Sequence, residues 1–332
     1  MPNFSPWKKR FRLAAGYFRG RPMWCAWQVT YRCNFRCGIC HYWKERPRKD
    51  EELSLGDIRL GARNLAECNS LLISIAGGEP TLRQDIPDVV KAIAAYHFPF
   101  ITTNGWLVTR EMARDLWRAG LWGVSVSIDY ADPAKHDAMR GVKGAYDRAV
   151  QALRFFVEER TRKHQRVNLM AVLNHENLDQ MEEIVRLARD EGAWFMVQPY
   201  CALKTGDEAF RPPETGCADV LMGLRRKYDN FLSNPVFLEN FDVACNGGVP
   251  GCAAGRAFFN IDNYGRVAMC VEDRRRPVGS LRDDGITDIL RRLHERYRDN
   301  QCRSCWYNCR GEIESLYTLR GALYSLPTLL MT

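Results

Sequence analysis

The sequence predicts an α/β protein, an incomplete, TIM-like (β/α)6 barrel followed by a small cysteine-rich domain. From residue 24 to about residue 200, short β-rich runs alternate with longer amphipathic stretches, the pattern of β/α units that feed a parallel sheet. Right-handed crossovers would curl six such units into an incomplete barrel. Beyond residue 239, six of the thirteen cysteines fall close together, and this density indicates a second metal site.

Residues 1–23 are predicted to form an amphipathic basic helix ahead of the barrel. Trp7, Phe11, Ala14 and Phe18 recur at helical spacing, with basic residues at positions 8, 9, 10, 12, 19 and 21 around them. We expect the aromatic stripe to pack on the body of the protein. The alternative is docking on an anionic membrane, because helices of this kind lie in the plane of the interface.

Six runs between residues 24 and 200 are predicted as the strands of the barrel, with helices in most of the intervals. The pattern Ser54-x-x-Asp57 is typical of a capping box at the start of the first of these helices. Because chemistry on such a sheet takes place at the carboxyl ends of the strands, the residues there are the candidates for a functional site. The predicted strands are Trp24–Thr30, Leu71–Ala76, Phe100–Thr103, Gly123–Ile128, Arg166–Val172 and Ala193–Gln198.

Three thiols, Cys33, Cys37 and Cys40, stand within eight residues after the first strand. Three thiolates can hold three irons of a four-iron cluster and leave the fourth iron open to bind and activate another molecule. One alternative is a helical stripe of buried cysteines, but Gly38 and its polar neighbours favour a loop that leaves a strand. The other is zinc, which normally takes four ligands in a structural site, and His41 is the nearest residue that could complete the set.

Distinctive residues also stand at the ends of the next three predicted strands. The glycines after the second strand allow close backbone approach, and the glutamate beside them offers a carboxylate to a cationic amine. Because the carboxyl ends of parallel strands meet at one edge, we expect all these stretches to converge with the three thiols. The residues are Gly77, Gly78, Glu79 and Pro80 after the second strand, Thr103 and Asn104 at the third, and Ser127 and Asp129 at the fourth.

The spacing Cys-x3-Cys-x2-Cys near the start of a β/α chain resembles the signature of the radical S-adenosylmethionine (radical SAM) superfamily. The resemblance implies a [4Fe–4S] cluster on Cys33, Cys37 and Cys40 whose open iron binds S-adenosylmethionine. An electron from the cluster would then split the sulfonium to give a 5′-deoxyadenosyl radical. The resemblance also implies that the run from Gly77 to Pro80 holds the methionine amino group.

The same resemblance assigns further cofactor contacts. Arg140 resembles the arginine that faces the methionine carboxylate, with Arg148 as a rival and a surface salt bridge as the alternative for both. Ile39 departs from the family pattern, in which an aromatic residue before the third cysteine often packs near the adenine. Tyr42 and Trp43 are the nearest substitutes. The residues that resemble nucleoside contacts are Thr103, Asn104, Ser127 and Asp129.

The cysteine-rich region contains a run, 258–269, that is typical of a β-hairpin with its turn at 262–265. Such a hairpin would place Cys252 near Cys270, and Cys302 and Cys305 would add a pair from a following helix. Four thiolates make a closed site, which zinc would accept as readily as iron and sulfide.

The spacing Cys-x12-Gly-x4-Cys from Cys252 to Cys270 resembles the opening of the SPASM and twitch domains, which hold auxiliary clusters in radical SAM enzymes. The later Cys-x2-Cys-x3-Cys is shorter than the full SPASM run, so the resemblance implies one auxiliary [4Fe–4S] cluster. The twitch-like domain would cover residues 240–332, after a connector at 201–239. Its candidate ligands are Cys252, Cys270, Cys302 and Cys305, with Cys309 or Cys245 as alternative or additional ligands, while Cys25, Cys68, Cys201 and Cys217 are expected to be packing residues.

The composition is that of a globular protein of 332 residues, with 46% hydrophobic and 27% charged residues. The absence of an eighteen-residue apolar run and of a secretory signal leads us to expect a cytoplasmic protein, with peripheral contact at the inner membrane face as an alternative. In a reducing compartment, thirteen cysteines favour metal or cluster binding over disulfides. The net charge of +8 is a modest excess for this length and decides nothing alone. The apolar tail, 316–332, should cover the core, line a hydrophobic channel or contact a membrane.

We therefore expect an oxidoreductase-type radical SAM enzyme that abstracts hydrogen from a small-molecule or lipid-like substrate. An auxiliary cluster would assist electron transfer or substrate binding, and a flavodoxin or ferredoxin would be the reducing partner. One alternative is a maturase that modifies a ribosomal peptide or protein side chain. The other is a non-catalytic zinc or iron–sulfur protein that binds nucleic acid, but outside residues 7–21 no basic stretch is interleaved with aromatic residues, so we expect no nucleic-acid partner.

Overall fold

Six parallel strands, hydrogen-bonded in chain order, form the predicted barrel sheet. The computed structural model describes residues 3–45, 47–162 and 165–330. The predicted (β/α)6 architecture is confirmed, and the strand bounds agree closely with those expected, the main difference being that one strand begins at Phe98 rather than Phe100. The strands are β1 Trp24–Thr30, β2 Leu72–Gly77, β3 Phe98–Thr103, β4 Gly123–Ser127, β5 Arg166–Leu173 and β6 Trp194–Pro199.

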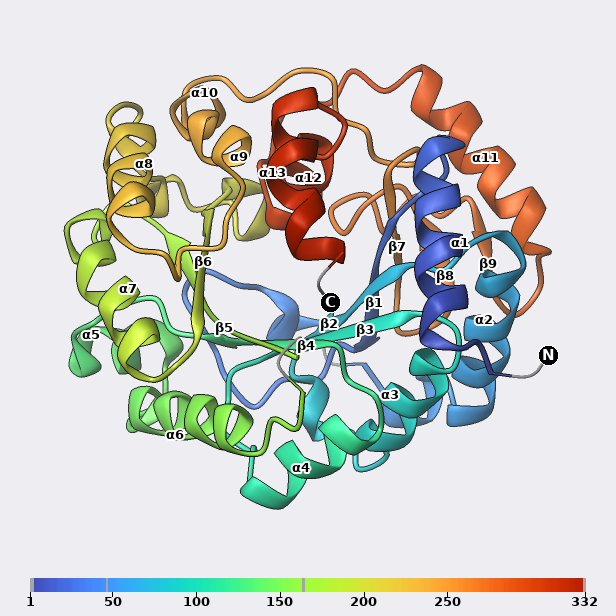
Figure 1. Cartoon of the computed structure of the whole chain (residues 1–332), viewed down its shortest axis with the longest axis horizontal. Helices are drawn as coiled ribbons and strands as arrows, with labels where there is room; N and C mark the ends of the chain where they lie inside the picture. The colour runs from blue at the N-terminus through green and yellow to red at the C-terminus, as the bar shows by residue number, and fades with distance from the viewer. Residues whose placement is uncertain (1–2, 46, 163–164, 331–332) are drawn as a thin grey trace.

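Helices connect these strands and cover the outer face of the curled sheet (Figure 1). Ser54 caps α2 as the sequence predicts: its hydroxyl accepts from the Asp57 N–H, and the Asp57 carboxylate accepts from the Ser54 N–H. The inner stripe of each helix is apolar, as in α3, where Ile86, Val89 and Ile93 are fully buried. The helices are α2 Leu55–Cys68, α3 Ile86–Ala94, α4 Arg110–Arg118, α5 Pro133–Arg140, α6 Ala145–Glu158 and α7 Met181–Asp190.

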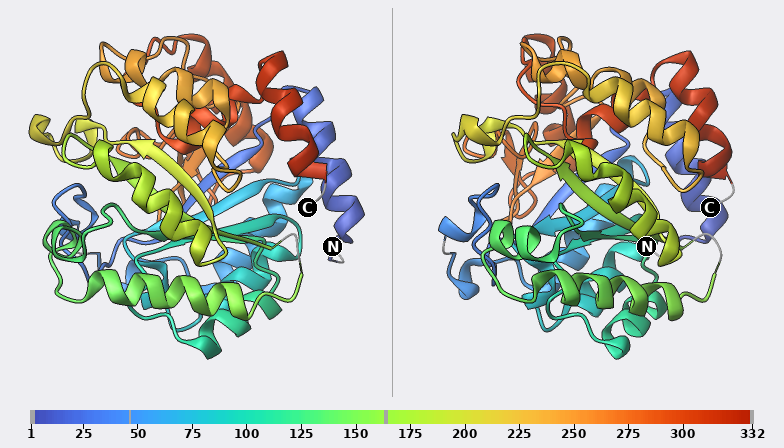
Figure 2. Two further views of the ribbon diagram at one scale, coloured as in Figure 1. Left: turned by 60° about the vertical axis from the view of Figure 1, so that its left-hand side comes forward. Right: turned by 90° about the vertical axis from the view of Figure 1, so that its left-hand side faces the viewer.

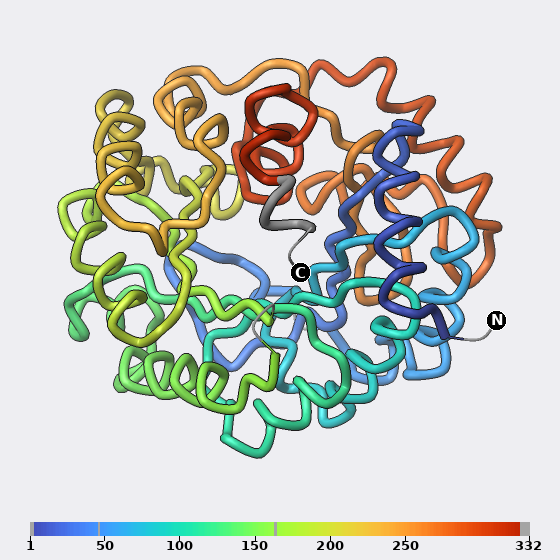
Figure 3. Tube along the Cα trace, in the orientation of Figure 1, coloured from blue at the N-terminus to red at the C-terminus, as the bar shows by residue number. Residues whose placement is uncertain are grey.

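The chain beyond β6 occupies the sector that the six units leave open, as the trace in Figure 3 shows. The loops contain short 3-10 helices. Two of them, Ala202–Lys204 and Glu208–Phe210, lie just after β6. The others are Tyr42–Lys44, Lys49–Glu51, Pro80–Leu82 and Leu178–Gln180. The helices of this part are α8 Cys217–Lys227, α9 Pro235–Glu239, α10 Phe241–Cys245, α11 Ile286–Arg298, α12 Asn308–Ser315 and α13 Leu319–Leu330.

The predicted hairpin is present as β7 Phe258–Ile261 and β8 Arg266–Ala268, which pair antiparallel, and β9 Gly279–Ser280 adds to it. Asp262 holds the turn, because its carboxylate accepts from the Tyr264 and Arg266 N–H groups. Strand β7 also pairs in parallel with β1, so the hairpin extends the barrel sheet rather than starting another. The boundaries predicted at residues 200 and 239 stay predictions.

Helix α1, Pro6–Phe18, lies on the outside of the barrel with its aromatic stripe turned away from it. The expected packing of that stripe is wrong, since Trp7, Phe11 and Phe18 are 80%, 71% and 84% exposed. The basic face of α1 packs against the barrel helices instead. Lys9 Nζ donates to the Ala94 carbonyl at 2.9 Å and Arg12 Nη2 to the Ala66 carbonyl, so both cations cap the C-termini of α3 and α2.

Most of the C-terminal tail forms α13. Residues 331–332, which follow the helix, and the side chains of 326–330 lie outside the described part. In its first half, Leu319 and Leu323 are exposed. Among the described residues, no helix is long and apolar enough to cross a membrane.

Candidate active site

The three thiols stand on a loop that β1 delivers to the carboxyl end of the sheet. Cys37 is buried, and Cys33 and Cys40 are partly buried. The Gly38 N–H donates to the Met139 carbonyl at 3.0 Å, which ties the loop to the end of α5. The side chain of Phe210 leaves little room beside Gly38, since an added Cβ would come within 3.2 Å of it. The sequence therefore predicted this loop and its position correctly.

Burial has the largest effect on the pKa values of two of these thiols. It raises the pKa of Cys33 to about 12 and also raises the pKa of Cys37, whose rise the Arg140 guanidinium opposes. Iron binding deprotonates thiols, so it removes the proton that burial favours. A cationic side chain beside Cys37 is well placed to stabilise the resulting thiolate.

The loop after β2 continues the pairing of β1 with β2 past the ends of both strands. The Gly78 N–H donates to the Thr30 carbonyl and the Glu79 N–H to the Arg32 carbonyl, each at 2.8 Å. A Cβ on Gly77 would lie 2.0 Å from the Thr30 oxygen, and one on Gly78 would lie 2.1 Å from the Arg32 oxygen. Only glycines allow this approach, which fixes the loop against the segment that leads to Cys33.

Glu79 lies inside this loop and is 1% exposed. Its Oε1 accepts from the Thr81 N–H at 3.0 Å and from the hydroxyls of Thr81 and Thr103 at 2.6 and 2.8 Å. Its Oε2 accepts from the Asn104 N–H at 2.7 Å. Asn104 in turn donates to Asn34 Oδ1 at 2.9 Å, so one carboxylate connects the ends of β2 and β3 to the cysteine loop.

Asp129 and Arg140 form a buried ion pair, with Oδ2 and Nη2 2.6 Å apart. The Arg140 guanidinium also contacts the Cys37 thiol, while its Nε and Asn34 Nδ2 are buried without a hydrogen-bond partner. Two unsatisfied buried donors beside three thiols fit an anionic group at this point. The rival Arg148 instead lies over the Trp106 ring, where both line a separate pocket.

A cavity of about 400 Å³ extends from the cysteine loop into the barrel. Cys37, Cys40, Gly77 and Arg140 line it near the loop, together with Ile39 and Ser127. Thr103 is not among the lining residues, because its hydroxyl is held by Glu79. Tyr42 lines the cavity and stacks on Tyr31, with ring centroids 5.2 Å apart.

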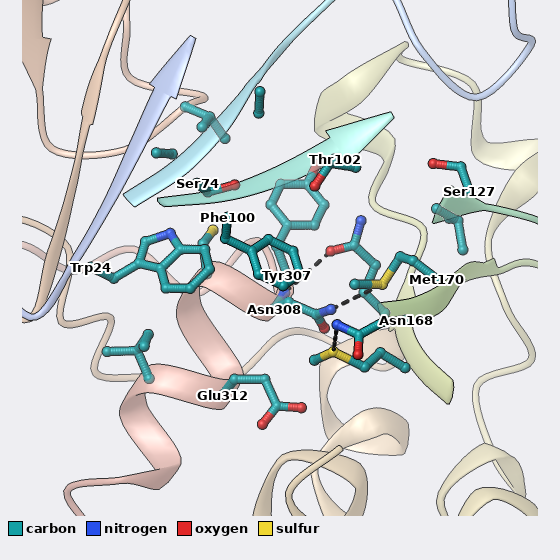
Figure 4. Close-up of a pocket in the computed structure, with 18 of the residues that line it drawn as sticks. Trp24, Ser74, Phe100, Thr102, Ser127, Asn168, Met170, Tyr307, Asn308 and Glu312 are labelled. Carbon is teal, nitrogen blue, oxygen red and sulfur yellow. Dashed lines mark hydrogen bonds between the residues drawn. The ribbon is translucent and has the colours of Figure 1, made fainter. Parts of the chain in front are cut away.

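Deeper in the cavity, the lining is rich in amides and thioethers (Figure 4). Asn308, at the start of α12, donates through its N–H to Gln198 Oε1 at 3.2 Å and through Nδ2 to Met170 Sδ at 3.1 Å. Asn168 donates to Met196 Sδ at 3.3 Å. Sequence reasoning missed these residues, although polar side chains inside otherwise apolar strands were the available signal.

Charged groups lie at the far end of the cavity. Burial raises the pKa of Glu312 to about 7 and lowers that of Arg166 to about 10, and each group counteracts the shift of the other. Both carboxylate oxygens of Glu312 accept from the Asn234 N–H, at 3.2 Å. The cavity therefore offers amide and ionic groups rather than a purely apolar wall.

The cysteines of the C-terminal region fall into three groups of neighbours. Burial raises the pKa of Cys305, and the charges of Cys309, Cys270 and Cys201 add to this shift, so these four thiols belong to one region of the fold. Cys201, which we expected to be a packing residue, also donates to the Ser304 carbonyl at 3.1 Å. Cys309 and Cys201 line the same cavity as Cys37 and Cys40.

The other two groups are pairs. A hydrogen bond from Cys252 lowers the pKa of Cys302. Cys245 pairs in the same way with Cys217, and its main charged neighbours are Asp242, Arg211 and Glu214. Among the described residues, no three His, Cys, Asp or Glu side chains converge closely enough to hold a single metal ion. An iron–sulfur cube is larger than an ion and would spread its ligands further.

Buried ionic contacts hold the loop that carries Cys302 and Cys305 and leads to Cys309 in α12. Arg310, fully buried, donates to the Cys305 carbonyl at 2.8 Å and to the Val249 carbonyl at 2.6 Å, and it pairs with Glu314. Such a guanidinium fixes the loop in place before any cluster binds.

Lys204 connects the two thiol regions. Its Nζ lies 3.4 Å from Glu272, two residues after Cys270, and 4.4 Å from the ring centroid of Tyr42, two residues after Cys40. A charged contact therefore spans the cavity wall between the two sets of thiols.

Residues 27–188 match the family model of the Radical SAM superfamily. The chain is similar to the mycofactocin maturase MftC of Mycolicibacterium smegmatis, with 28% identity over 320 residues that cover 90% of this chain and 80% of that protein. It is also similar to the PqqA peptide cyclase of Bradyrhizobium diazoefficiens, with 26% identity over 263 residues, or 76% of this chain and 67% of that protein. The structure of Streptococcus suis SuiB bound to the precursor peptide SuiA shares the fold, with a TM-score of 0.69 and 18% identity over 89% of this chain and 73% of that one.

A parallel partial barrel with three thiols after its first strand, matched by this family model, defines a radical SAM domain. The chain belongs to the radical SAM superfamily and is an enzyme. Its cofactors are a [4Fe–4S] cluster and S-adenosylmethionine.

Proposed function

We propose that Cys33, Cys37 and Cys40 hold the cluster and that hydrogen is abstracted from a substrate bound in the barrel cavity. With S-adenosylmethionine bound, such a cluster supplies a 5′-deoxyadenosyl radical that removes a hydrogen atom from carbon. The observation that carries the proposal is that two of the thiols, beside the unsatisfied Arg140 Nε, line the cavity. The unsatisfied donors of Arg140 and Asn34 would receive the cofactor carboxylate.

Glu79 acts in this proposal as a positioning residue. Three protein donors share its Oε1 and one uses its Oε2, and the side chain, 1% exposed, is not among the residues that line the cavity. The methionine amino group would then meet the backbone of the Gly77–Gly78 segment that Glu79 holds in place. Thr103 and Asn104 belong to the same support, while Ser127 on the cavity wall would face the nucleoside.

The first test is the chemistry itself. Iron-loaded protein supplied with S-adenosylmethionine and a strong reductant should release 5′-deoxyadenosine slowly without substrate, and Cys37→Ala should abolish the release. Cys217→Ala, a cysteine away from the cavity, is the matched control. No 5′-deoxyadenosine from intact, iron-loaded protein under any reducing condition would refute the proposal.

The substrate in this proposal is a peptide. The relatives support it, since one is named as a peptide cyclase and the structurally similar SuiB was solved with a precursor peptide. The cavity supports it as well, because Asn168, Asn308 and Gln198 offer amide groups to a peptide backbone, and Arg166 and Glu312 offer charges to side chains or termini. Peptides encoded beside this gene should raise the rate of 5′-deoxyadenosine release, and the absence of stimulation by any of them would count against a peptide.

A second candidate is the small-molecule or lipid-like substrate. The observation in its favour is that the cavity continues to Leu316 and Tyr324, next to the exposed leucines of α13. In the same assay, a lipid extract would then stimulate release where the peptides do not.

An auxiliary cluster is the third part of the proposal, with Cys270, Cys305, Cys309 and Cys201 as its ligands. The set suggested by spacing, Cys252, Cys270, Cys302 and Cys305, is the alternative. Reconstituted protein should hold roughly eight irons, and the variant Cys33→Ala/Cys37→Ala/Cys40→Ala roughly four. In that variant, the further change Cys201→Ala should lower the iron content, whereas Cys302→Ala should not. Zinc in place of the remaining iron would exclude an auxiliary cluster.

A small one-electron carrier such as a flavodoxin or ferredoxin would reduce the catalytic cluster. A reduced flavodoxin should replace the chemical reductant in the release assay. A cytoplasmic location stays a prediction.

A further inference from the structure

The outer surface of α1 and the start of α13 together expose five large apolar side chains, which we call the docking face. They are Trp7, Phe11, Phe18, Leu319 and Leu323, and their exposed fractions lie between 64% and 84%. Figure 2 shows the two helices at the same edge of the molecule in both views. Single exposed apolar residues are ordinary, but five large ones on two neighbouring helices indicate an interaction site.

The docking face is fixed in its outward orientation. Beside the aromatic stripe, Tyr17 donates to the Leu316 carbonyl at 2.7 Å and stacks on Tyr317, with centroids 5.1 Å apart, which joins α1 to the segment just before α13. Gly16 lies against Asn69 so closely that a Cβ would come within 1.9 Å of the amide nitrogen. The helix therefore cannot turn its aromatic stripe inward without losing these contacts and the caps made by Lys9 and Arg12.

The charged residues beside the docking face indicate which kind of partner it would bind. Lys8 and Arg19 are exposed next to Trp7 and Phe18, so cations flank the aromatic stripe. Aromatic residues at the centre and basic residues at the margins suit the boundary between acyl chains and anionic headgroups. A protein partner would need a complementary apolar groove with acidic margins, whereas an anionic bilayer presents both features everywhere.

We propose that this enzyme binds anionic membrane surfaces through the docking face, with α1 lying in the plane of the interface. The binding is peripheral and reversible, since one short helix and two leucines bury little apolar area. The proposal does not rest on the identity of the substrate, because the docking face lies on the outside of the barrel. A peptide and a lipid-like substrate are both compatible with it.

The test is co-sedimentation of full-length, iron-loaded protein with vesicles of phosphatidylglycerol and phosphatidylcholine, or of phosphatidylcholine alone. We expect binding to the anionic vesicles only, and release as salt rises from about 0.1 M to about 1 M, where the Debye length falls from about 10 Å to about 3 Å. Trp7→Ala/Phe11→Ala/Phe18→Ala should lower binding more than about tenfold, because the buried aromatic area is lost. Lys8→Gln/Arg19→Gln should lower it roughly 25-fold at low salt, since each basic residue near the surface contributes about fivefold.

The matched control is Leu60→Ala/Val220→Ala/Val243→Ala, which removes three exposed apolar side chains from α2, α8 and α10. All three variants change exposed residues, so their thermal stability and 5′-deoxyadenosine release without substrate should equal those of the wild type. Negligible pelleting of wild type with anionic vesicles, or equal binding by the aromatic and control variants, would overturn the proposal. A dimer in sedimentation velocity that the aromatic variant abolishes, together with no vesicle binding, would assign the face to a second copy instead.

Discussion

Replacing Glu79 by glutamine measures how far the cofactor site depends on one buried carboxylate. Four donors point at the two oxygens, two of them the backbone N–H groups of Thr81 and Asn104. A glutamine has one oxygen, so either orientation of its amide leaves one of these N–H groups facing an NH2 group. A buried donor without an acceptor costs about 1–3 kcal/mol. With an unfolding entropy of about 2.1 cal/mol/K per residue, a kcal/mol shifts the melting temperature of a chain of this length by about 1.4 °C, so we expect a decrease of roughly 1–4 °C.

The assay pairs thermal unfolding with the affinity of reconstituted protein for S-adenosylmethionine, measured anaerobically by equilibrium dialysis. In the proposed arrangement Glu79 supports the loop without binding the amino group, so the affinity should fall less than about tenfold, as for a displaced loop rather than a lost charge pair. Glu182→Gln, which removes an exposed carboxylate paired with Lys227, is the control and should change neither quantity. An unchanged melting temperature together with a hundredfold loss of affinity would refute the reasoning and make Glu79 a direct ligand of the amine.

Gly78→Ala should abolish 5′-deoxyadenosine release, because the new Cβ would lie 2.1 Å from the Arg32 oxygen, whereas Gly223→Ala, with open space around it, should not. Arg310→Met should lower the free energy of unfolding in urea by about 3–5 kcal/mol, since it leaves Glu314 and two carbonyls unpaired, with the exposed Arg303→Met as the control. His97 accepts from the Leu71 N–H, and burial lowers its pKa to about 4, below the ordinary 6.5. The unfolded chain therefore binds the proton first as pH falls, and stability should drop by about 2–3 kcal/mol between pH 7 and 4.5. His97→Asn should show a smaller drop, and an equal one would contradict this account.

The sequence was sufficient to predict the barrel, because its strands are largely buried and are followed by residues that can bind a cofactor or a metal. In β1 every residue after Trp24 is buried, which the largely apolar run of this strand predicts, although Gln28 and Thr30 are polar. Because functional residues of a parallel sheet lie at the carboxyl ends of its strands, the sequence predicted that Cys33 and Gly77, at the ends of adjacent strands, lie at the same edge. The contacts of Glu79 did not follow, since its four donors come from two loops whose approach only the fold determines.

Other features depended on contacts between distant segments. Helix α1 has an aromatic face and a basic face, and the choice between them was decided by the Ala66 and Ala94 carbonyls, which the α1 sequence cannot reveal. Cys201 stands far from Cys270 and Cys305 along the chain, so no spacing pattern includes it. The parallel pairing of β7 with β1 was also unpredicted, because the two strands lie more than two hundred residues apart in the sequence.

The pairing of β7 with β1 fixes the position of the hairpin relative to the strand that leads into the cysteine loop. The loop bearing Cys33, Cys37 and Cys40 leaves β1, and Cys252 and Cys270 flank the hairpin whose first strand is the hydrogen-bonded neighbour of β1. Adjacent strands keep a spacing of about 4.8 Å, so a backbone ladder rather than a hinge joins the hairpin to the strand that precedes the cysteine loop. The relative position of β1 and β7 should therefore stay constant, and motions that admit a substrate would come from the segments that cover the cavity.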